Sequence, residues 1–397
     1  MRLTVVTPWF PTPADPVEGS FIAAQTAALA GLGHDVVCCV VHPFAPWPAG
    51  LLSRKWAVFA ATPAAWTWGT LAAHRHRYVS VPRYVLYGGE GRRMARSLGD
   101  HVKRHQADAI VAHTELVGEG VLRAGNKPHP PVVVVIHGIN LAPGMLATAH
   151  RRANLRWALQ QASRVVVVGP RLVEVVKEWG TPSEKIRVVP NGFDAELVAT
   201  APTSDRIPSA SRFEVLSVSN LVRGKGIDVN LRALALIRRE GINARYTVVG
   251  TGPSRRELQR LADELGVTGS VRFLGRLEPA QVHRELEAGD VFSLPSSPEA
   301  FGVAYVEAMA HGKPIVGCTG EGPELFCRDG EHGFLVPPRD PAAVAAVWRR
   351  LADVEVRLRL GASARARAFS EFTWQRSAAS LEAVLSEVCP RNVGAGQ

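Results

Sequence analysis

The sequence predicts an α/β protein with two doubly wound parallel-sheet domains. Its 397 residues, 46% of them hydrophobic, are enough for two ordinary domains with complete cores. Short apolar runs alternate with helix-length amphipathic segments, as in a parallel sheet covered by helices. Residues 198–212, VATAPTSDRIPSASR, lose this alternation and are rich in Pro, Ser, Thr and Ala, which is typical of a linker.

Each half of the chain has its own series of expected strands and helices. Strands are expected at short apolar runs bounded by turn residues, and helices where apolar residues recur with a period near 3.6. The first series contains strands at 3–7, 35–41, 109–112, 132–136, 164–168 and 186–189 and helices at about 21–32, 94–105, 154–161 and 172–179. The second contains strands at 213–218, 245–249, 271–274, 291–294 and 314–317 and helices at 228–239, 255–265, 279–288 and 302–311.

The two series define the expected domains, residues 1–200 and residues 210–370. Ligands of open parallel sheets bind outside the carboxyl ends of the strands, and small-molecule sites concentrate at domain interfaces. We therefore expect a ligand cleft between the two domains.

The net charge of +10 is concentrated in one segment, residues 51–105. It holds ten Lys and Arg residues against Glu90 and Asp100, interleaved with Trp, Tyr, Phe and His. Such a segment suits an anionic membrane surface or a phosphorylated acceptor, and a solvated basic face is the alternative. No nucleic-acid-binding signature accompanies it, so we do not expect a nucleic-acid partner.

The cysteines and the N-terminus indicate a cytoplasmic protein. The five cysteines are odd in number, scattered and without metal-ligand spacing, which favours a reducing compartment. The N-terminus MRLTVVTPWF is interrupted too early by Pro8 to be a signal peptide. No apolar run approaches the roughly 20 residues that span a bilayer.

Two glutamates, Glu299 and Glu307, are the most informative acidic residues. Positions eight apart diverge by about 80° on a helix, so the spacing suits Glu299 in a loop and Glu307 within the following helix. The free N–H groups at the start of that helix, near Phe301 to Ala304, would form an anion site. Together these groups match a phosphorylated, hydroxyl-rich ligand such as a nucleotide sugar.

The same stretch resembles the E-x7-E motif of the family 4 glycosyltransferases, which are retaining enzymes with the GT-B fold. The resemblance runs along nearly the whole chain. Further motifs match in order: VVPNGFD (188–194), NLVRGKGID (220–228), VVGTGPSRREL (248–258), FLGRL (273–277), GDVFSLPSSPEAFG (289–302) and GKPIVG (312–317).

The resemblance implies roles for the matched residues. His137, at the end of VVVVIHG, would lie beside the donor sugar, Glu299 would meet the sugar hydroxyls, and Lys225 would neutralise the departing diphosphate. Glu307 would hold the ribose. The other donor-binding residues would be Asn220, Arg223, Gly250, Gly252, Arg276, Leu277, Phe301, Gly302 and Val303, and the acceptor side would include Gly19, Ser20 and His113. A core histidine is the alternative for His137, and an ordinary turn-rich loop is the alternative for residues 8–21.

Two departures from common patterns affect the expected chemistry. Family members often have an arginine where this chain has Asn220, and we take Arg223 as its replacement. No Asp-x-Asp motif occurs, so we expect transfer without a metal ion and without a cofactor. By the same resemblance, the amphipathic helix at about 373–392 would pack back on the first domain.

The family retains the anomeric configuration of the sugar, and the resemblance assigns no carboxylate nucleophile. This favours front-face transfer, in which the departing phosphate oxygen takes the proton of the acceptor. The donor would be a UDP- or GDP-sugar. The acceptor would be a hydroxyl group on a lipid-linked or otherwise anionic molecule, met at the inner membrane face during cell-wall or exopolysaccharide assembly. Glycosylation of a soluble natural product, a sugar-nucleotide epimerase and a non-catalytic sugar-nucleotide sensor are alternatives. A dinucleotide dehydrogenase is disfavoured because Arg255 occupies the third glycine position of G-x-G-x-x-G.

Overall fold

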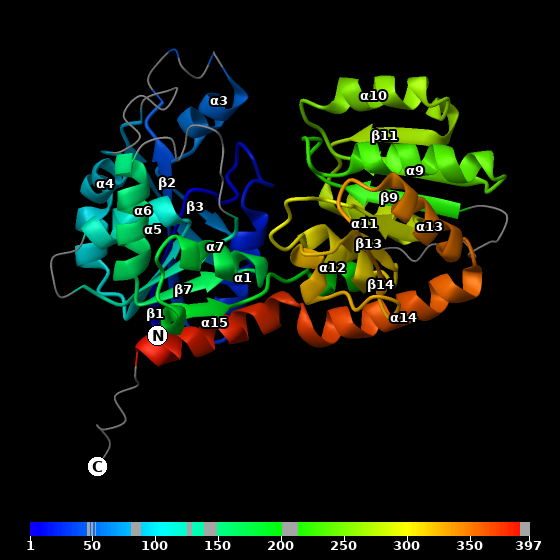
Figure 1. Cartoon of the computed structure of the whole chain (residues 1–397). Helices are drawn as coiled ribbons and strands as arrows, with labels where there is room; N and C mark the ends of the chain where they lie inside the picture. Colours follow the sequence, from blue (N-terminus) through cyan, green and yellow to red (C-terminus); the bar gives the residue numbers. More distant parts are fainter. Residues whose placement is uncertain are drawn as a thin grey trace. The chain divides into compact units, whose positions relative to one another are not determined.

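The computed structural model describes residues 1–45, 48, 51, 53–80, 89–124, 129–138, 149–200 and 213–389. Its contacts divide the chain into two compact units, each with one sheet covered by helices (Figure 1). Unit 1 is Met1–Asn191 with Trp374–Gln397, and unit 2 is Gly192–Thr373. The predicted α/β class with two parallel-sheet domains is therefore confirmed.

Unit 1 has an eight-stranded sheet in the order β3-β4-β2-β1-β5-β6-β7-β8, in which only β3 is antiparallel to its neighbour. Its strands are β1 (Arg2–Thr7), β2 (Asp35–Pro43), β3 (Ala65–Trp68), β4 (Leu71–Tyr78), β5 (Ala109–His113), β6 (Val132–Ile136), β7 (Arg164–Val167) and β8 (Ile186–Val188). Its helices are α1 (Ser20–Gly31), α3 (Arg54–Ala61), α4 (Glu90–Arg104), α5 (Glu115–Ala124), α6 (Ala149–Gln161), α7 (Arg171–Glu178), η3 (Ser183–Lys185) and α15 (Trp374–Val388).

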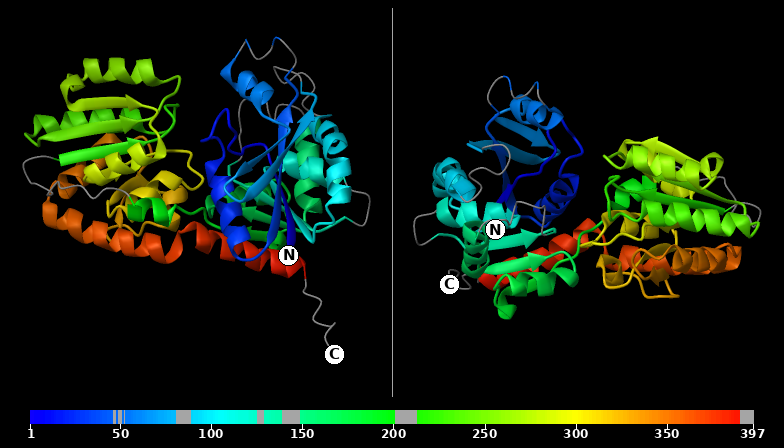
Figure 2. Two further views of the ribbon diagram at one scale, coloured as in Figure 1. Left: turned by 180° about the vertical axis from the view of Figure 1, so that it is seen from behind. Right: turned by 45° about the horizontal axis from the view of Figure 1, so that its top comes forward.

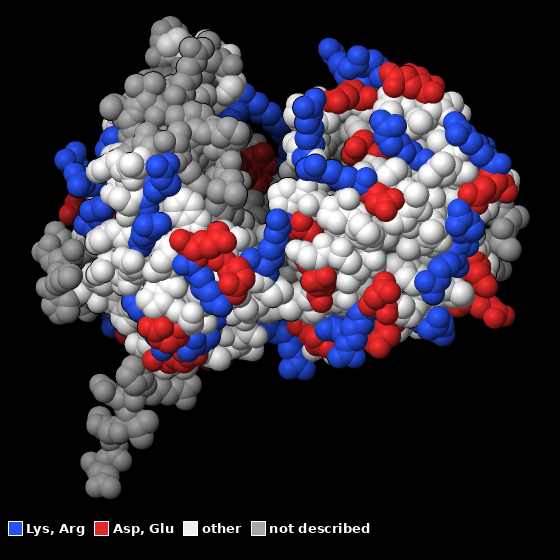
Figure 3. Space-filling model, in the orientation of Figure 1, with Lys and Arg blue, Asp and Glu red and all other residues white. Residues whose placement is uncertain are grey.

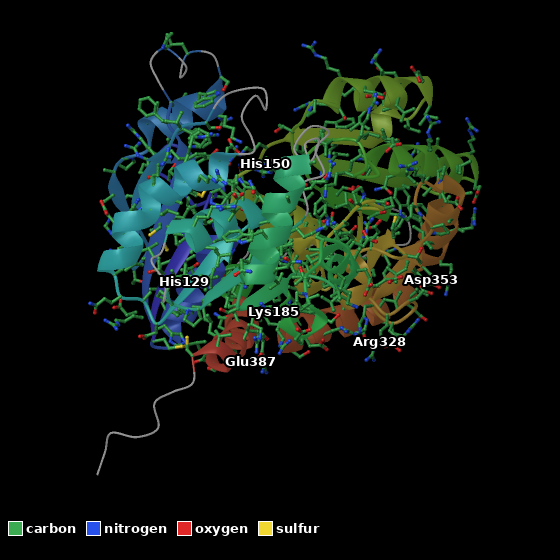
Figure 4. The ribbon with its side chains drawn as sticks, turned by 60° about the vertical axis from the view of Figure 1, so that its left-hand side comes forward. His129, His150, Lys185, Arg328, Asp353 and Glu387 are labelled. Carbon is green, nitrogen blue, oxygen red and sulfur yellow. The ribbon has the colours of Figure 1, made fainter. Side chains whose placement is uncertain are left out.

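The last helix, α15, belongs to unit 1 although it follows unit 2 in sequence. It lies along α1, and Leu381 and Leu385 complete the apolar core of the unit (Figures 1 and 2). The Gln25 amide donates to the Ser377 hydroxyl at 2.8 Å. Glu387, labelled in Figure 4, accepts hydrogen bonds from Arg164 and Arg187. Burial of its apolar face explains why this helix packs on unit 1.

Unit 2 has a six-stranded parallel sheet in the order β11-β10-β9-β12-β13-β14. Its strands are β9 (Phe213–Val218), β10 (Ala244–Val249), β11 (Val271–Gly275), β12 (Val291–Ser293), β13 (Ile315–Cys318) and β14 (Gly333–Val336). Its helices are α8 (Ala195–Thr200), α9 (Ile227–Arg239), α10 (Arg255–Glu264), η4 (Thr268–Ser270), α11 (Pro279–Ala288), α12 (Val303–Ala310), η5 (Gly322–Leu325), α13 (Pro341–Leu351) and α14 (Val354–Glu371).

The boundary between the units differs from the expected one at residue 200. It falls after Asn191, and α8 belongs to unit 2. The reason is local packing: the Phe193 amide donates to the Phe372 carbonyl at 2.9 Å, and the Phe193 ring contacts Phe369 edge-on. Most of the predicted linker, residues 201–212, lies outside the described residues.

Each sheet has one point where the strand order reverses, and such points are where doubly wound sheets bind ligands. In unit 1 the reversal lies between β1 and β5, and in unit 2 between β9 and β12. The loops after these strands therefore contain the candidate sites.

Among the described helices, none is both long enough and apolar enough to cross a membrane. On the visible face of unit 2, basic and acidic side chains are interspersed (Figure 3).

Candidate active site

An ion pair joins the two loops at the reversal point of unit 2. The Nζ atom of Lys225, in the loop after β9, lies 2.7 Å from Oε2 of Glu299, in the loop after β12. The Lys225 side chain is 26% exposed and that of Glu299 is 11% exposed. The pair thus places a cation and a nearly buried carboxylate together at the carboxyl edge of the sheet.

Glycines on both sides of Lys225 allow the two loops to touch. Gly224 and Gly226 have φ values of 90° and 73°, a left-handed conformation that favours glycine. The Ser297 amide donates to the Gly224 carbonyl at 2.7 Å. A Cβ atom on Gly226 would lie 2.3 Å from the Pro295 carbonyl oxygen. The turn therefore fixes the position of Lys225 against the second loop.

Glu321, which no sequence motif marks, positions the Glu299 loop. It is 5% exposed, and its two carboxylate oxygens accept from the Ser297 hydroxyl at 2.7 Å and from the Glu299 amide at 2.8 Å. The Gly322 amide in turn donates to the Glu299 carbonyl at 2.9 Å. No linear motif signals this role, because it depends on β13 lying beside β12.

We expect Glu321→Ala to lower kcat/KM by about 10- to 100-fold, because it would displace Glu299, the carboxylate expected to meet the sugar hydroxyls, and a misplacement of this kind costs about that much. Glu321→Gln should recover most of the activity, since a glutamine offers the carbonyl oxygen to Glu299 and the amide to Ser297. Glu324→Ala, three residues after Glu321 and exposed, is the matched control for steady-state kinetics. Equal losses in the alanine and glutamine variants would contradict the positioning role.

The start of α12 presents free backbone N–H groups. Gly302, with φ 90° and ψ 80°, is the N-cap residue, and no side chain caps the helix. The N–H groups of residues 301–304 donate to no other described residue. The Phe301 side chain is buried against Phe326, so Phe301 can offer a ligand only its backbone. Uncapped amides at a helix N-terminus favour an anion.

Glu307 lies within α12 and is half-buried. Burial, followed by the charge of Asp194, raises the pKa of its carboxyl from 4.5 to about 7. Asp194 itself is exposed and caps α8, accepting from the Leu197 amide at 2.9 Å. Glu307 is thus accessible to a ligand rather than enclosed in the apolar core.

The predicted glycines after β10 are required by backbone packing. A Cβ atom on Gly250 would lie 1.8 Å from the Ser219 carbonyl oxygen, and one on Gly252 would lie 2.3 Å from that of Leu221. Both glycines therefore bring the loop after β10 against the loop after β9. Arg276, which is exposed, and Leu277, which is half-buried, follow β11 at the same edge of the sheet.

Arg223 and Asn220 are exposed in the loop that carries Lys225. The Arg223 side chain is 88% exposed and lies 3.6 Å from Glu257. It lines a cavity of about 530 Å³ beside α9 and α10, whose lining does not include Lys225, Glu299 or Glu307. We locate the candidate site by the Lys225–Glu299 pair and not by this cavity, because the pair lies at the strand-order reversal.

In unit 1, His113 and His137 end the neighbouring strands β5 and β6 and form a pair. Nδ1 of His113 lies 2.8 Å from Nε2 of His137, and the two rings stack. Burial lowers the pKa of His137 to about 4 and, with the neighbouring imidazole, lowers that of His113 well below its usual value. Both rings are therefore neutral at pH 7.

The His137 ring has an unused polar atom, Nδ1, which is buried and has no partner among the described residues. His113 is 1% exposed, so it supports His137, and the prediction that it lines an acceptor surface is corrected by its burial. Thr114, directly after His113, has a φ of 81°, a strained conformation for a β-branched residue. This strain lies at the strand-order reversal of unit 1.

Gly19 and Ser20 stand where the loop after β1 enters α1. Gly19 is the N-cap residue with φ 75°, and a Cβ atom there would lie 2.4 Å from the Trp9 carbonyl carbon. Ser20, the first residue of α1, is exposed. The structure thus places Gly19, Ser20, His113 and His137 at the carboxyl edge of the unit 1 sheet, and the predicted donor-binding residues at that of unit 2.

Comparison with known proteins gives the family. Residues 205–367 match the family described as "Glycosyl transferases group 1", and residues 7–197 match "Glycosyltransferase Family 4". The chain is 30% identical over 308 residues to the GDP-mannose-dependent alpha-(1-6)-phosphatidylinositol monomannoside mannosyltransferase of Mycolicibacterium smegmatis. That match covers 74% of this chain and 79% of the mannosyltransferase.

Solved structures resemble the fold. Sucrose-phosphate synthase from Thermosynechococcus elongatus has a TM-score of 0.78 at 21% identity, covering 98% of this chain and 99% of that one. Anabaena Alr3699/HepE, in complex with UDP and glucose, has a TM-score of 0.71 at 21% identity, covering 97% and 99%. The family models match both units, and the mannosyltransferase is 30% identical over most of the chain. The chain therefore belongs to the family 4 glycosyltransferases and has their GT-B fold.

Proposed function

We propose that this glycosyltransferase moves a hexose from a nucleoside-diphosphate sugar to a hydroxyl acceptor with retention of anomeric configuration. The pathway would be cell-envelope, exopolysaccharide or lipid-linked glycan assembly. The observation that carries the proposal is the Lys225–Glu299 pair beside the uncapped start of α12. A diphosphate and a sugar need these groups together, namely a cation, free amides and a carboxylate.

Unit 2 binds the donor in this proposal. Lys225 and the amides at residues 301–304 receive the diphosphate, and Glu299 accepts hydrogen bonds from sugar hydroxyls. Without a donor the two charged side chains neutralise each other at 2.7 Å, so neither is left buried and unpaired. Glu307 accepts from the ribose hydroxyls. Gly250 and Gly252 let the loop after β10 pack against the loop after β9, which carries Lys225, and so help to shape the donor site.

Unit 1 supplies His137, whose buried and unpartnered Nδ1 atom suits a sugar hydroxyl. His113 holds the ring in place, and the loop at Gly19 and Ser20 lines the acceptor side. The reaction is front-face transfer: the C1–O bond to the diphosphate breaks, a bond to the acceptor oxygen forms, and the acceptor proton passes to the departing phosphate oxygen. The protein contributes alignment and charge stabilisation.

The proposal includes transfer without a metal ion. Lys225 and the α12 amides provide the charge compensation that a divalent ion provides in metal-dependent enzymes. Activity should therefore survive EDTA. Loss of activity that magnesium or manganese restores would contradict this part of the proposal.

The central experiment is a panel of nucleotide sugars that includes GDP-mannose and UDP-glucose, scored by thermal shift and by slow donor hydrolysis. One donor should raise the melting temperature and be hydrolysed, because a ligand that binds only the folded state stabilises it. Product anomeric configuration, read by NMR, should match that of the donor. An inverted product would overturn retention, and binding of no nucleotide sugar would overturn the whole assignment. A donor epimer formed without an acceptor would indicate an epimerase.

For Arg223→Ala we expect the donor KM to rise about tenfold, the effect of one charge-assisted contact to phosphate at an exposed position. The matched control is Arg232→Ala, an exposed arginine that lines the same cavity from α9. Unchanged kinetics in the Arg223 variant would show that it does not replace the arginine missing at residue 220.

We propose that the acceptor is anionic or lipid-linked and is met at a membrane surface through segment 51–105. The described aromatic residues of the segment are largely internal: Trp66 and Trp68 pack edge-on against Phe10, and Phe59 is buried. Several basic residues of the segment are exposed, among them Arg54 and Lys55 at the start of α3, Arg77 on β4 and Arg92 and Arg96 on α4. Leu51, near Arg54 in sequence, is 80% exposed. Arg83, Tyr84 and Tyr87 lie outside the described residues.

Vesicle co-sedimentation tests this surface. The protein should sediment with phosphatidylglycerol-containing vesicles more than with pure phosphatidylcholine vesicles, because basic residues near an anionic surface each contribute about 1 kcal/mol. Arg54→Glu with Lys55→Glu should reduce the difference, whereas Arg359→Glu, on α14 of unit 2, should not. Binding that is equal for both lipids, or absent for both, removes the membrane proposal and favours a soluble acceptor.

A further inference from the structure

A second cluster of reactive side chains lies inside unit 1, among residues that the proposed reaction does not use. The sulfur of Cys39, on β2, and ring nitrogens of His76, on β4, and His101, on α4, all lie within 4.8 Å of one another. Cys39 is fully buried and His101 is 9% exposed. Three side chains with metal-binding atoms therefore converge from three separate elements.

The strand register explains why they converge. β2 and β4 are parallel neighbours, with Cys39 opposite His74 and Val41 opposite His76. Alternation along a strand puts Cys39, His74 and His76 on the same face of the sheet. The helix α4 covers this face, because Nδ1 of His76 lies 3.2 Å from the carbonyl of Ser97, one turn before His101.

The bond to Ser97 also fixes the chemistry of His76. A carbonyl only accepts hydrogen bonds, so Nδ1 must carry the proton and Nε2 must carry the lone pair. That Nε2 atom is buried and has no hydrogen-bond partner among the described residues. A histidine whose one nitrogen is held by a carbonyl, leaving the other free to bind, is the usual arrangement of a metal ligand.

Further imidazoles surround the cluster. The His101 ring stacks on His105 with centroids 3.8 Å apart, and lies 5.8 Å from His74. His105 is exposed, so the stacked imidazoles reach the surface beside the end of α4. The unpartnered Nε2 atom of His76 gains little from packing alone, since an unpaired buried polar atom is costly.

We propose that Cys39, His76 and His101 bind one divalent transition-metal ion of the zinc type, with water in the fourth position. A thiolate and two neutral imidazoles are ligands that Zn²⁺ and Co²⁺ accept in tetrahedral geometry. On binding, the Cys39 thiol releases its proton to solvent as the sulfur–metal bond forms. In a tetrahedral zinc site the ligand atoms are about 3.6 Å apart, so the side chains would close by at most about an ångström from their present separations of up to 4.8 Å.

Such an ion would tie β2, β4 and α4 together at one end of the unit 1 sheet. None of its ligands is among the residues proposed for donor binding or transfer, so the site is separate from the proposed reaction. Linear spacing does not show it. His42, three residues after Cys39, lies on the opposite face of β2, and only the fold brings His76 and His101 to Cys39.

The test uses the full chain, freed of metal by a chelator and kept reduced with a phosphine in place of a thiol. Titration with Co²⁺ should give one equivalent of binding, with a sulfur-to-cobalt charge-transfer band and tetrahedral visible bands, and Zn²⁺ should displace both. Cys39→Ser should abolish the charge-transfer band. Cys38→Ser is the matched control: Cys38 is equally buried but points to the opposite face of β2, and it should keep the band.

A second variant and a second readout protect the test from a folding defect. His76→Gln can still donate to the Ser97 carbonyl but lacks a ring nitrogen, so it should lower Co²⁺ affinity at least tenfold. Zn²⁺ should raise the melting temperature of the wild type and not of Cys39→Ser. A cobalt spectrum without the sulfur band, a band that persists in Cys39→Ser, or no saturable binding would each overturn the proposal. The effect of a chelator on the transfer activity of the wild type is measured as well. If the chelator lowers that activity, if only Zn²⁺ restores it, and if the chelator has no such effect on Cys39→Ser, the loss belongs to this site and not to the donor site.

Discussion

Replacing Lys225 with methionine is expected to lower kcat/KM by about 100- to 1000-fold, the effect of removing one fixed group that stabilises developing charge. Lys225 is held by a glycine on each side and by the 2.7 Å contact to Glu299, so no other side chain can easily take its place. Methionine keeps the length and apolar stem of lysine and removes only the charge. Steady-state kinetics with the donor identified by the nucleotide-sugar panel measures the loss.

The same substitution should also destabilise the protein, and this effect must be separated from catalysis. Glu299 is only 11% exposed, and removing its partner leaves a nearly buried carboxylate without compensation. The double variant Lys225→Met with Glu299→Gln should regain most of the lost melting temperature and none of the activity. Lys313→Met is the control, because Lys313 is the other lysine of unit 2. Recovery of activity in the double variant would show that Lys225 acts only as a structural partner of Glu299.

The sheets of both units could be predicted because most of their parallel strands are buried on both faces and read as apolar runs. Val132–Ile136 and Phe213–Val218 are found at the predicted positions. The strands β3 and β4 were missed: Leu71–Tyr78 reads LAAHRHRY, in which histidines and arginines replace the apolar residues of an inner strand. Its place in the sheet is set by pairing with β2, which the local pattern does not encode.

The candidate site could be predicted where its residues lie in one motif, as Glu299 and Glu307 do. Residues that act through tertiary contacts could not. Glu321 reaches the Glu299 amide only because β13 is next to β12, and the sequence gives no sign of it. Gly250 and Gly252 were singled out for a ligand, yet the Ser219 and Leu221 carbonyls already require them, so motif glycines can serve packing as well as binding.

Donor affinity is expected to depend on pH through Glu307. The pKa of its carboxyl is raised to about 7, first by burial and then by Asp194, and the ionised form is the stronger acceptor for ribose hydroxyls. The Kd of a nucleotide sugar should therefore fall about tenfold between pH 6 and pH 8 as this carboxyl loses its proton. A nucleotide sugar is the proper probe, because its diphosphate diester has no proton to lose in this range, whereas a free nucleoside diphosphate has one.

Folding stability should change in the opposite direction. The folded state holds the Glu307 proton up to about pH 7 and the unfolded state only up to about 4.5. This contribution to stability is therefore fully present below pH 4.5 and is lost as the pH rises to about 7. The free energy of unfolding, measured in urea at pH 5 and pH 8 for the wild type and for Glu307→Gln, separates the contribution of Glu307 from that of other titrating groups.

Two variants show whether Glu307 is the group responsible. Glu307→Ala should raise the donor Kd about 100-fold, the effect of losing two hydrogen bonds to a carboxylate, and Glu307→Gln should remove the pH dependence. Asp194→Asn should lower the midpoint of the pH curve only in part, because burial is the larger cause. His283, near Asp194, stays neutral throughout because burial lowers its pKa to about 4. A pH dependence that persists in Glu307→Gln would assign the titration, and with it the ribose contact, to another residue.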